Sequence, residues 1–539
     1  MTMPAAESFD FIVAGAGSAG CVVATRLSES GRYNVLLLEA GPADKSFWIH
    51  VPMGFPMLFA DPRINWMFET EPVEGLDQRS MYQPRGKVLG GTSAINGMVY
   101  IRGHRRDYDR WREMGCVGWG YDDVLPFFKK AEDQQRGPDE YHGVGGPLPV
   151  SDLGRPCPLS DALIAAAQQS GIPFAADFNG SVQEGAGYYQ STIRDGRRMS
   201  TSQAYLRPAR NRPNLKVVTG AQATRIVQED GRAVGIEYRT KAGIQRADAR
   251  REIVLSGGAF GSPQLLMLSG IGPGAHLQAF GIETHVDLPE VGANLADHFQ
   301  ASTMFRCARP VTINDLANSW PRKIAAGLQY LLFKRGPLST SGIHAGIFTR
   351  SDPSLPQPDI QFNAGIWSIG GMKGPGLAPH PFPGFSLAAV HLNPSTSGTV
   401  RLRSADPLAP PSISQQFLAG QGDIDPMIAA IRIARDIVRQ PAMAAYYQGE
   451  IAPGPEVATD ADIEAYLRAT GVANLHPVGS CRMGADDRSV VDPQLRVRGI
   501  DRLRVADASI MPTLPAGNTN APSIMIGEKA VAMILEDAR

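Results

Sequence analysis

Residues 9–27, "FDFIVAGAGSAGCVVATRL", constrain the fold more than any other stretch of the chain. A short apolar run leads into a glycine-rich turn, and the residues after the turn carry apolar side chains at helical spacing. A second apolar run, "NVLLLEA", follows at 34–40. Continuous apolar strands are typical of a parallel sheet that is buried on both faces. The pattern therefore predicts a βαβ unit and a chain that begins inside a doubly wound α/β domain.

The glycine-rich turn is a candidate dinucleotide-binding site. Gly15, Gly17 and Gly20 have the spacing that permits a tight turn and lets a pyrophosphate approach the N-terminus of the next helix. Glu39 ends the second predicted strand, where an acidic side chain can accept hydrogen bonds from ribose hydroxyls. The motif predicts a bound dinucleotide, but it does not decide between NAD and FAD.

Composition places the chain among ordinary soluble globular proteins. Of its 539 residues, 43% are apolar and 19% are charged, and the formal net charge is −1. This length suggests two large domains or roughly three to four smaller ones. The 52 basic and 53 acidic residues are interspersed, so no basic stripe favours nucleic acid. No apolar run reaches the length of a membrane span, so no transmembrane segment is expected.

The cysteines and the N-terminus indicate a reducing compartment, and we expect a cytoplasmic protein. The five cysteines are scattered and form no CxxC pair, so the sequence indicates neither a disulfide framework nor a zinc site. The N-terminus has no basic region before its apolar stretch, which is therefore unlike a signal peptide. No metal site is predicted, and nothing in the sequence indicates the oligomeric state.

The rest of the chain alternates between two patterns of composition and predicted secondary structure. Residues 214–240 predict a β-meander that turns at Asp230-Gly231, and residues 251–272 predict a buried strand, a small-residue turn and an apolar helix. From about 310 to 465, proline-rich loops separate strand-like runs and one helical run, which suits a sheet with long surface loops and a pocket wall. Residues 503–537 return to a strand, a loop and an amphipathic helix, as if completing the first domain.

Several ordered motifs carry a resemblance to a known family. "GKVLGGTSAINGMVYIRGHRRDYD" (86–109) and "GAFGSPQLLMLSGIG" (258–272) closely resemble the two signature patterns of the glucose-methanol-choline (GMC) oxidoreductases, flavoproteins that bind FAD. The resemblance extends through "INWMFETEP" (64–72), "VGANLADHF" (291–299), "HPVGSCRMG" (476–484) and "VADASIMPTLPAGNTNAPSIMIGEKA" (505–530). It covers nearly the whole chain and implies that the dinucleotide is FAD.

The resemblance also implies the architecture. We expect an α/β protein in which a Rossmann-like FAD-binding domain is interleaved with an α+β substrate-binding domain, the latter an antiparallel sheet flanked by helices. The FAD-binding domain is assigned to residues 1–155, 200–309 and 466–539. The substrate-binding domain is assigned to residues 156–199 and 310–465.

Two residues are the candidate catalytic pair. Taken alone, His476 is more often a structural histidine, and Asn518 in "PAGNTNAP" suits an Asx-type turn. The resemblance reverses both interpretations, because His476 matches the family's catalytic histidine and Asn518 its second catalytic position. An imidazole suits proton abstraction from an alcohol near neutral pH. An amide can donate a hydrogen bond to the developing alkoxide. The other histidines show no ligand spacing and are expected to be structural or surface residues.

The resemblance also implies a set of cofactor contacts. The glycine-rich turn and Glu39 serve the ADP half, and Ala223 contacts the adenine. Residues near 85–99 lie beside the pyrophosphate and the flavin ring, and Thr519 to Pro522 lie near its pyrimidine edge. The full set is Gly15, Gly17, Ser18, Ala19, Gly20, Glu39, Ala40, Arg85, Val88, Gly91, Asn96, Val99, Ala223, Asp507, Ala508, Thr519, Asn520 and Pro522.

Ile95 bears on how the cofactor is held. In covalent members of the family, a histidine tethered to the flavin immediately precedes the asparagine of this motif. Here the residue before Asn96 is Ile95, which has no nucleophilic atom. The sequence therefore predicts FAD that is bound without a covalent link.

The substrate is indicated only weakly. In choline-oxidising members, "SGIHAGIFTRS" would carry a glutamate at the position of His344, and a neutral imidazole cannot replace that counter-ion. Phe55, Trp367 and Leu475 are expected to form an apolar wall. Choline is thus disfavoured, and a neutral, partly apolar primary alcohol is predicted.

Three functions remain open at this point. The first is an alcohol dehydrogenase that passes electrons to a dye, a quinone or a carrier protein. The second is an oxidase of the same family that uses O₂, which we weigh slightly lower. The third is an FAD-containing hydroxynitrile lyase, since the same histidine can serve as acid and base in that chemistry.

Overall fold

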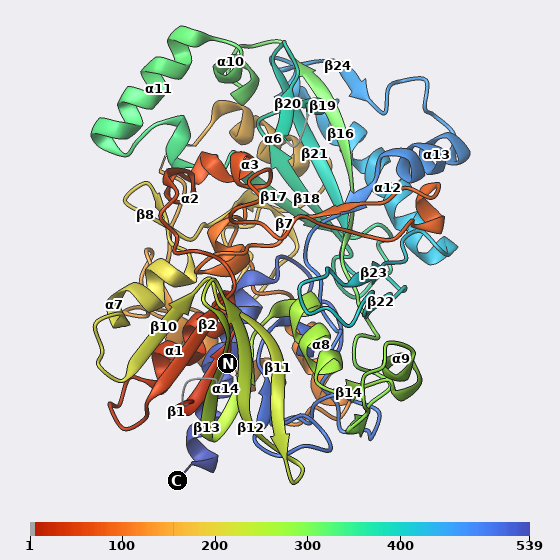
Figure 1. Cartoon of the computed structure of the whole chain (residues 1–539). Helices are drawn as coiled ribbons and strands as arrows, with labels where there is room; N and C mark the ends of the chain where they lie inside the picture. Colours follow the sequence, from red (N-terminus) through yellow and green to blue (C-terminus); the bar gives the residue numbers. More distant parts are fainter. Residues whose placement is uncertain (1–5, 155, 374–375, 539) are drawn as a thin grey trace.

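The computed structural model describes residues 6–154, 156–373 and 376–538. Two seven-stranded sheets dominate it. In Figure 1 one sheet lies in the lower half, near both termini of the chain, and the second sheet lies above it. Among the described residues, no helix combines the length and the apolar character that crossing a membrane requires.

The lower sheet contains the predicted βαβ unit. Its parallel strands run in the order β10-β2-β1-β13-β26, and α1 (Ser18–Leu27) connects β1 to β2. Every residue of β2 is buried, as expected for a strand covered on both faces. The doubly wound arrangement is therefore confirmed. The parallel strands are β1 (Glu7–Ala14), β2 (Val35–Glu39), β10 (Leu215–Thr219), β13 (Gly243–Leu255) and β26 (Leu503–Val505).

The predicted meander is only partly correct. β11 (Gln222–Glu229) and β12 (Arg232–Thr240) are antiparallel and turn at Asp230-Gly231 as expected. β10, however, belongs to the opposite edge of the sheet, where it pairs in parallel with β2. The sequence signal failed because an apolar run of five residues looks the same in either pairing. β13 joins the two patterns: its first half pairs antiparallel with β12, and its second half pairs in parallel with β1.

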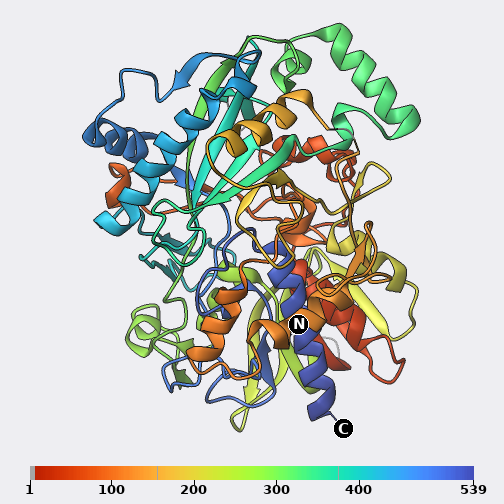
Figure 2. The ribbon, with the colours of Figure 1, turned by 180° about the vertical axis from the view of Figure 1, so that it is seen from behind.

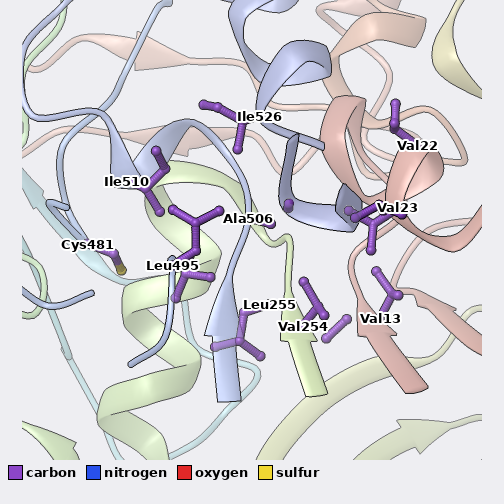
Figure 3. Close-up of a cluster of buried hydrophobic side chains, with 14 of the residues drawn as sticks. Val13, Val22, Val23, Val254, Leu255, Cys481, Leu495, Ala506, Ile510 and Ile526 are labelled. Carbon is purple, nitrogen blue, oxygen red and sulfur yellow. The ribbon is translucent and has the colours of Figure 1, made fainter. Parts of the chain in front are cut away.

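The C-terminal helix completes this domain. α14 (Asn520–Asp537) packs along α1, and the two helices lie side by side in Figures 1 and 2, although they come from opposite ends of the chain. Gly527 permits the close approach, since a Cβ there would lie 2.9 Å from the Cβ of Val22. Figure 3 shows the resulting core, in which apolar side chains of α1, α14, β1, β13 and the segment after β26 meet.

The second sheet is entirely antiparallel, as predicted. Its order is β24-β16-β21-β18-β17-β7, and β25 also pairs with β16. Alternate residues point to opposite faces. One face packs against α6 (Pro158–Gln169), α12 (Gln421–Val438) and α13 (Asp460–Thr470). The strands are β7 (Gly185–Tyr188), β16 (Phe299–Cys307), β17 (Ile343–Thr349), β18 (Ile360–Gly365), β21 (Gly384–His391), β24 (Tyr447–Ala452) and β25 (Val472–Ala473).

The domain division stays a proposal. Sheet membership moves two of its boundaries: β16 and β25 hydrogen-bond within the second sheet, although both lie in segments assigned to the FAD-binding domain. We therefore propose that the second domain includes these two strands.

Smaller elements complete the described fold. Further helices are α2 (Phe47–His50), α3 (Phe55–Leu58), α4 (Arg105–Glu113), α5 (Tyr121–Ala131), α7 (Arg207–Ala209), α8 (Gly258–Leu268), α9 (Gly274–Ala279), α10 (Ile313–Ala317) and α11 (Trp320–Phe333). Short helical turns are η1 (Pro52–Gly54), η2 (Glu74–Leu76), η3 (Gly91–Ala94), η4 (Ser202–Leu206), η5 (Pro337–Ser339), η6 (Pro441–Met443) and η7 (Ala508–Ile510). Two-stranded sheets pair β3 (Phe68–Glu69) with β4 (Tyr82–Gln83), β5 (Glu132–Gln134) with β6 (Leu148–Val150), β8 (Ile193–Arg194) with β9 (Arg197–Arg198), β14 (Ile271–Gly272) with β15 (Val286–Asp287), β19 (Ile369–Lys373) with β20 (Gly376–Pro379) and β22 (Thr399–Arg401) with β23 (Ser412–Ser414).

Candidate active site

One cavity of about 870 Å³ is lined by residues of both large sheets. Ala14, Glu39 and Leu255, which end β1, β2 and β13, line its lower part. Asn363 of β18 and Ser386 of β21 line its upper part, on the face of the second sheet opposite the helices. Ligands of doubly wound proteins bind at the carboxyl ends of the parallel strands, and this cavity begins there.

The backbone around His476 is held in an unusual conformation. Leu475, which directly precedes His476, has a φ of 67°, a left-handed value that non-glycine residues seldom adopt. Two polar side chains hold this turn in place, the partly buried Arg85 and the buried Asp297. Arg85 donates a hydrogen bond of 2.7 Å to the carbonyl of Leu475, and Asp297 accepts one of 2.7 Å from the backbone N–H of His476. Burial raises the pKa of the Asp297 carboxyl to about 7, and the nearby Arg85 guanidinium opposes that rise, so the two side chains that hold the turn favour each other's charged form.

The His476 imidazole lies between two polar partners. Its Nε2 atom is 3.1 Å from the amide nitrogen of Asn518, and its Nδ1 atom is 3.1 Å from Nδ1 of His298. Burial lowers the pKa of His476 well below 6.5, and the nearby His298 and Arg85 lower it further. The side chain is therefore a neutral base at neutral pH. The predicted catalytic pair is brought together in the cavity.

The contacts of the imidazole are compatible with one tautomer. If the Asn518 amide donates to Nε2, the ring proton of His476 is on Nδ1 and points to Nδ1 of His298 as acceptor. Burial lowers the pKa of His298 to about 3, so His298 is neutral and can accept that bond. The amide nitrogen of Asn474 also lies 3.3 Å from Nδ1 of His476. If the Asn474 amide is flipped by 180°, its oxygen becomes a second acceptor for the Nδ1 proton.

Sequence reasoning missed His298 and Asn474. We expected His298 to be structural or on the surface, but its side chain is fully buried and contacts the candidate base. Histidine spacing gave no signal, because His298 and His476 are far apart in the chain. The one available pointer was that His298 lies inside "VGANLADHF", one of the blocks that carry the family resemblance.

The glycine-rich turn fits a nucleotide closely approaching the backbone. Gly15 has a φ of 105°, and a Cβ on Gly20 would lie 1.9 Å from the carbonyl oxygen of Gly15, so both glycines serve the packing of the turn itself. Gly17 differs, because a Cβ added there would have only the Ser256 carbonyl oxygen within 4 Å, at 3.9 Å. Gly17 lines the cavity, so the space beside it belongs to the cavity and not to the protein core.

Two carboxylates line the same part of the cavity. Glu39 accepts hydrogen bonds from the backbone N–H groups of Ala16 (3.0 Å) and Gly41 (2.8 Å), which fixes its side chain beside the turn. Burial raises the pKa of Glu39 to about 7, and these two hydrogen bonds oppose that rise. Asp507 is held by the Ser262 hydroxyl at 2.6 Å.

The first turn of α14 also opens onto the cavity. Its leading residues have N–H groups without partners inside the helix, and they form a positive helix end. Such an end can stabilise negative charge on a bound group. The cavity-lining residues here are Asn518, Thr519, Asn520 and Ser523.

Most predicted cofactor contacts line the cavity, and three do not. Gly20 packs against Gly15, and Val88 packs in an apolar cluster with Ile49 and Ile95. Neither Gly20 nor Val88 is among the cavity-lining residues. Pro522 is buried in α14. The residues that do line it are Gly15, Gly17, Ser18, Ala19, Glu39, Ala40, Arg85, Gly91, Asn96, Val99, Ala223, Asp507, Ala508, Thr519 and Asn520.

The predicted apolar wall is present, but His344 is not part of it. The rings of Phe55 and Trp367 lie 5.5 Å apart, and both residues line the cavity with Leu475. His344 is buried outside the lining, where its Nε2 atom lies 3.1 Å from the Thr340 hydroxyl. The register of β17 shifts at this point, and a bulge re-aims side chains. Its neighbour Ile343 lines the cavity instead, so our argument from His344 against choline was wrong.

Comparison with known proteins identifies relatives along almost the whole chain. Two family models described as GMC oxidoreductase match residues 9–300 and 394–527. The alcohol dehydrogenase [acceptor] of Pseudomonas putida is 43% identical over 98% of this chain and 96% of its own. The mitochondrial choline dehydrogenase of Homo sapiens is 42% identical over 98% of this chain and 90% of its own.

A solved structure shows the same fold. It is a formate oxidase of Aspergillus oryzae RIB40, in a variant studied for its effect on FAD modification. The two chains superpose with a TM-score of 0.91 at 28% identity, and the match covers 99% of each chain.

Proposed function

Because the chain belongs to the GMC oxidoreductase family, we propose that His476 and Asn518 carry out the FAD-dependent oxidation of a neutral primary alcohol to an aldehyde. The relatives are FAD-dependent alcohol and choline dehydrogenases and oxidases, and this chain is an oxidoreductase of that group. The observation that carries the proposal is the contact of 3.1 Å between Nε2 of His476 and the amide of Asn518 inside the cavity.

The residues divide the proton chemistry between them. Nε2 of His476 takes the hydroxyl proton of the alcohol, while Nδ1 keeps its own proton toward His298. The Asn518 amide donates to the alcohol oxygen as negative charge develops there. Bound FAD supplies the acceptor for the hydride that leaves the alcohol carbon. The glycine-rich turn, Glu39, Asp507 and the first turn of α14 would hold that cofactor.

The charge distribution favours a neutral substrate. The carboxylates among the cavity-lining residues are Glu39 and Asp507, and both belong to the part that would hold the cofactor. The lining nearer to His476 contains the cationic Arg85 but no carboxylate, and its other members include Phe55, Trp367 and Asn363. A cationic alcohol would lose water there without gaining a counter-ion. An alcohol with an apolar body and one hydroxyl group matches this lining better.

The first test is a panel of alcohols mixed with the yellow protein without oxygen. We expect aryl and medium-chain aliphatic primary alcohols to bleach the flavin, and choline and polyols to bleach it far more slowly. Faster bleaching by choline would contradict the neutral-substrate proposal. Bleaching by none of the alcohols, together with cleavage of a cyanohydrin, would replace alcohol oxidation with lyase chemistry.

The same experiment addresses the electron acceptor. We propose a dehydrogenase, so that the bleached protein is reoxidised faster by an artificial dye than by air. The mixture is opened to air in one arm and receives the dye in the other. Rapid reoxidation by air would instead show an oxidase.

We propose that FAD is held without a covalent bond. Ile95 lines the cavity, is fully buried among Ile49, Leu58 and Ile64, and offers no nucleophilic atom. Precipitating the protein with acid is therefore expected to release all of the yellow colour into the supernatant. An absorption spectrum of both fractions checks this. Colour that stays with the washed pellet would contradict the prediction.

A further inference from the structure

α11 projects from the edge of the second domain. In Figures 1 and 2 this helix, drawn in green, lies at the margin of the molecule. Of its residues, only Ala326 and Tyr330 are buried. A helix of this length is stabilised mainly by packing an apolar face against a partner, so the small contact with the rest of the chain is unusual.

The exposed side of α11 is strongly apolar. Six large apolar residues of the helix are between 54% and 74% exposed. Five of them recur three or four positions apart and form one face, and Phe333 lies to one side of it. A contiguous apolar surface of this kind marks a site that is covered in the working protein. The six residues are Trp320, Ile324, Leu328, Leu331, Leu332 and Phe333.

The apolar surface continues onto α2. The Tyr330 hydroxyl lies 3.2 Å from the carbonyl oxygen of His50, which joins the two helices. Phe47 and Trp48, on α2, are 50% and 41% exposed. We call the six residues of α11 together with Phe47 and Trp48 the docking face.

Basic side chains lie beside the α11 part of the docking face. Residues 316–351 contain five basic residues and no acidic one, whereas the whole chain is nearly neutral. The Lys323 and Lys334 ammonium groups each lie 4.9 Å from a neighbouring aromatic ring, those of Trp320 and Tyr330. Within the described residues, no ion pair involves Lys323, Lys334 or Arg335. The α11 part of the docking face thus has positive charge beside its apolar residues, and among these basic residues Arg322 lies 4.0 Å from Asp315.

We propose that the docking face binds the surface of a lipid bilayer that contains anionic lipids. A helix of 14 residues is too short to span a bilayer, but it can lie in the headgroup layer with its apolar side toward the acyl chains. Tryptophan favours that layer, and lysine and arginine are attracted to anionic headgroups. A second copy of this chain fits less well, because a two-fold contact would bring like charges together.

Docking would bring the cavity close to the membrane. Phe55, in α3, lines the cavity, whereas Met57, in the same helix, is 58% exposed. η1, which leads into α3, packs against η5, which follows α11. The docking face is therefore continuous with the wall of the cavity. Apolar alcohols and apolar electron acceptors concentrate in membranes, and docking would place the cavity beside them.

The test is flotation of the flavin-containing protein with lipid vesicles, and it does not depend on turnover. We expect binding to vesicles of phosphatidylcholine mixed with phosphatidylglycerol, and much weaker binding to phosphatidylcholine alone. Raising the salt from about 0.1 M to about 0.5 M is expected to weaken binding to the mixed vesicles, since salt screens the charge attraction.

Three triple variants separate the contributions. The apolar variant replaces three residues of the docking face, and the basic variant replaces three basic residues of α11 and the residues that follow it. Each is expected to bind mixed vesicles at least about tenfold more weakly, and the control is expected to bind like the unaltered protein. The control removes equally exposed apolar residues elsewhere on the surface. The variants are Leu328→Gln/Leu332→Gln/Phe333→Gln, Lys323→Gln/Lys334→Gln/Arg335→Gln, and the control Val117→Gln/Val182→Gln/Ile244→Gln.

Two outcomes would overturn the proposal. One is equal flotation of the apolar variant and the control. The other is a dimer in solution that the apolar variant dissociates, with no vesicle binding by either protein, because the docking face would then join two copies. Dye-coupled activity on a water-soluble alcohol is expected to be unchanged in all variants, which verifies that each is folded.

Discussion

Replacing His476 with alanine is expected to slow reduction of the flavin by a good alcohol by about 10²- to 10⁴-fold, the usual loss when a general base is removed. The imidazole lies in the cavity with Nε2 beside Asn518 and Nδ1 beside His298. Alanine keeps the backbone contacts with Arg85 and Asp297, so the cofactor site is expected to remain intact. Anaerobic stopped flow, monitored at the flavin absorbance, measures the rate.

The matched control is His285→Ala, which removes an exposed imidazole that is not among the cavity-lining residues. It is expected to leave the rate unchanged. If His476→Ala binds flavin normally and is still reduced at a rate close to that of the unaltered protein, His476 is not the base.

The kcat/KM of alcohol oxidation, measured as a function of pH, is expected to depend little on pH above 6.5. The pKa of His476 lies well below 6.5 because of burial, with His298 and Arg85 contributing. Only protonation removes the basic lone pair, so kcat/KM should stay level from about pH 8 down to neutral pH and fall only in more acidic solution. A loss that is half complete near pH 7 would contradict this prediction and point to a neighbouring group such as Asp297, whose pKa burial raises to about 7.

Replacing Gly17 with valine is expected to give a folded protein that has lost its flavin. A Cβ added at Gly17 would meet only the Ser256 oxygen, at 3.9 Å, so the first side-chain atom fits without a clash in the protein itself. The side chain would instead enter the cavity where the dinucleotide approaches the turn. Overpacking typically costs about 1–3 kcal/mol. That corresponds to about one to two orders of magnitude in affinity for FAD.

Flavin content after gel filtration and titration of the colourless protein with FAD measure the effect. The control is Gly154→Val, at an exposed glycine with no neighbour within 4 Å of an added Cβ. A Gly17→Val protein that is yellow and binds FAD as tightly as the control would show that the turn does not hold the dinucleotide.

Local patterns predicted the elements with strong periodicity. The βαβ unit, the hairpin at Asp230-Gly231 and the last helix depend on residues close together in the chain, and the structure confirms all three. β10 was misplaced, because nothing in a run of five residues tells which distant strand it will pair with.

The candidate site was predicted by motifs, and its supporting contacts were not. His476 and Asn518 come from segments 42 positions apart, and the structure brings them within hydrogen-bonding distance. His298 and the Arg85–Asp297 pair act on His476 only through the tertiary fold, so no local spacing reveals them. His344 was misassigned because a shift in strand register changes which side chain faces the cavity, and such shifts are invisible in sequence.

The division of the cavity between two sheets has an evolutionary consequence. Many of the residues proposed to hold FAD lie at the carboxyl ends of the lower sheet and at the start of α14, and His476 follows β25, whereas the wall proposed to face the alcohol comes from alternate positions of β16, β18 and β21. Substitutions at those positions change the shape of the wall without altering the flavin contacts. Recognition and redox chemistry can therefore diversify independently, and relatives of this chain can acquire different alcohols while one electron-transfer apparatus is retained.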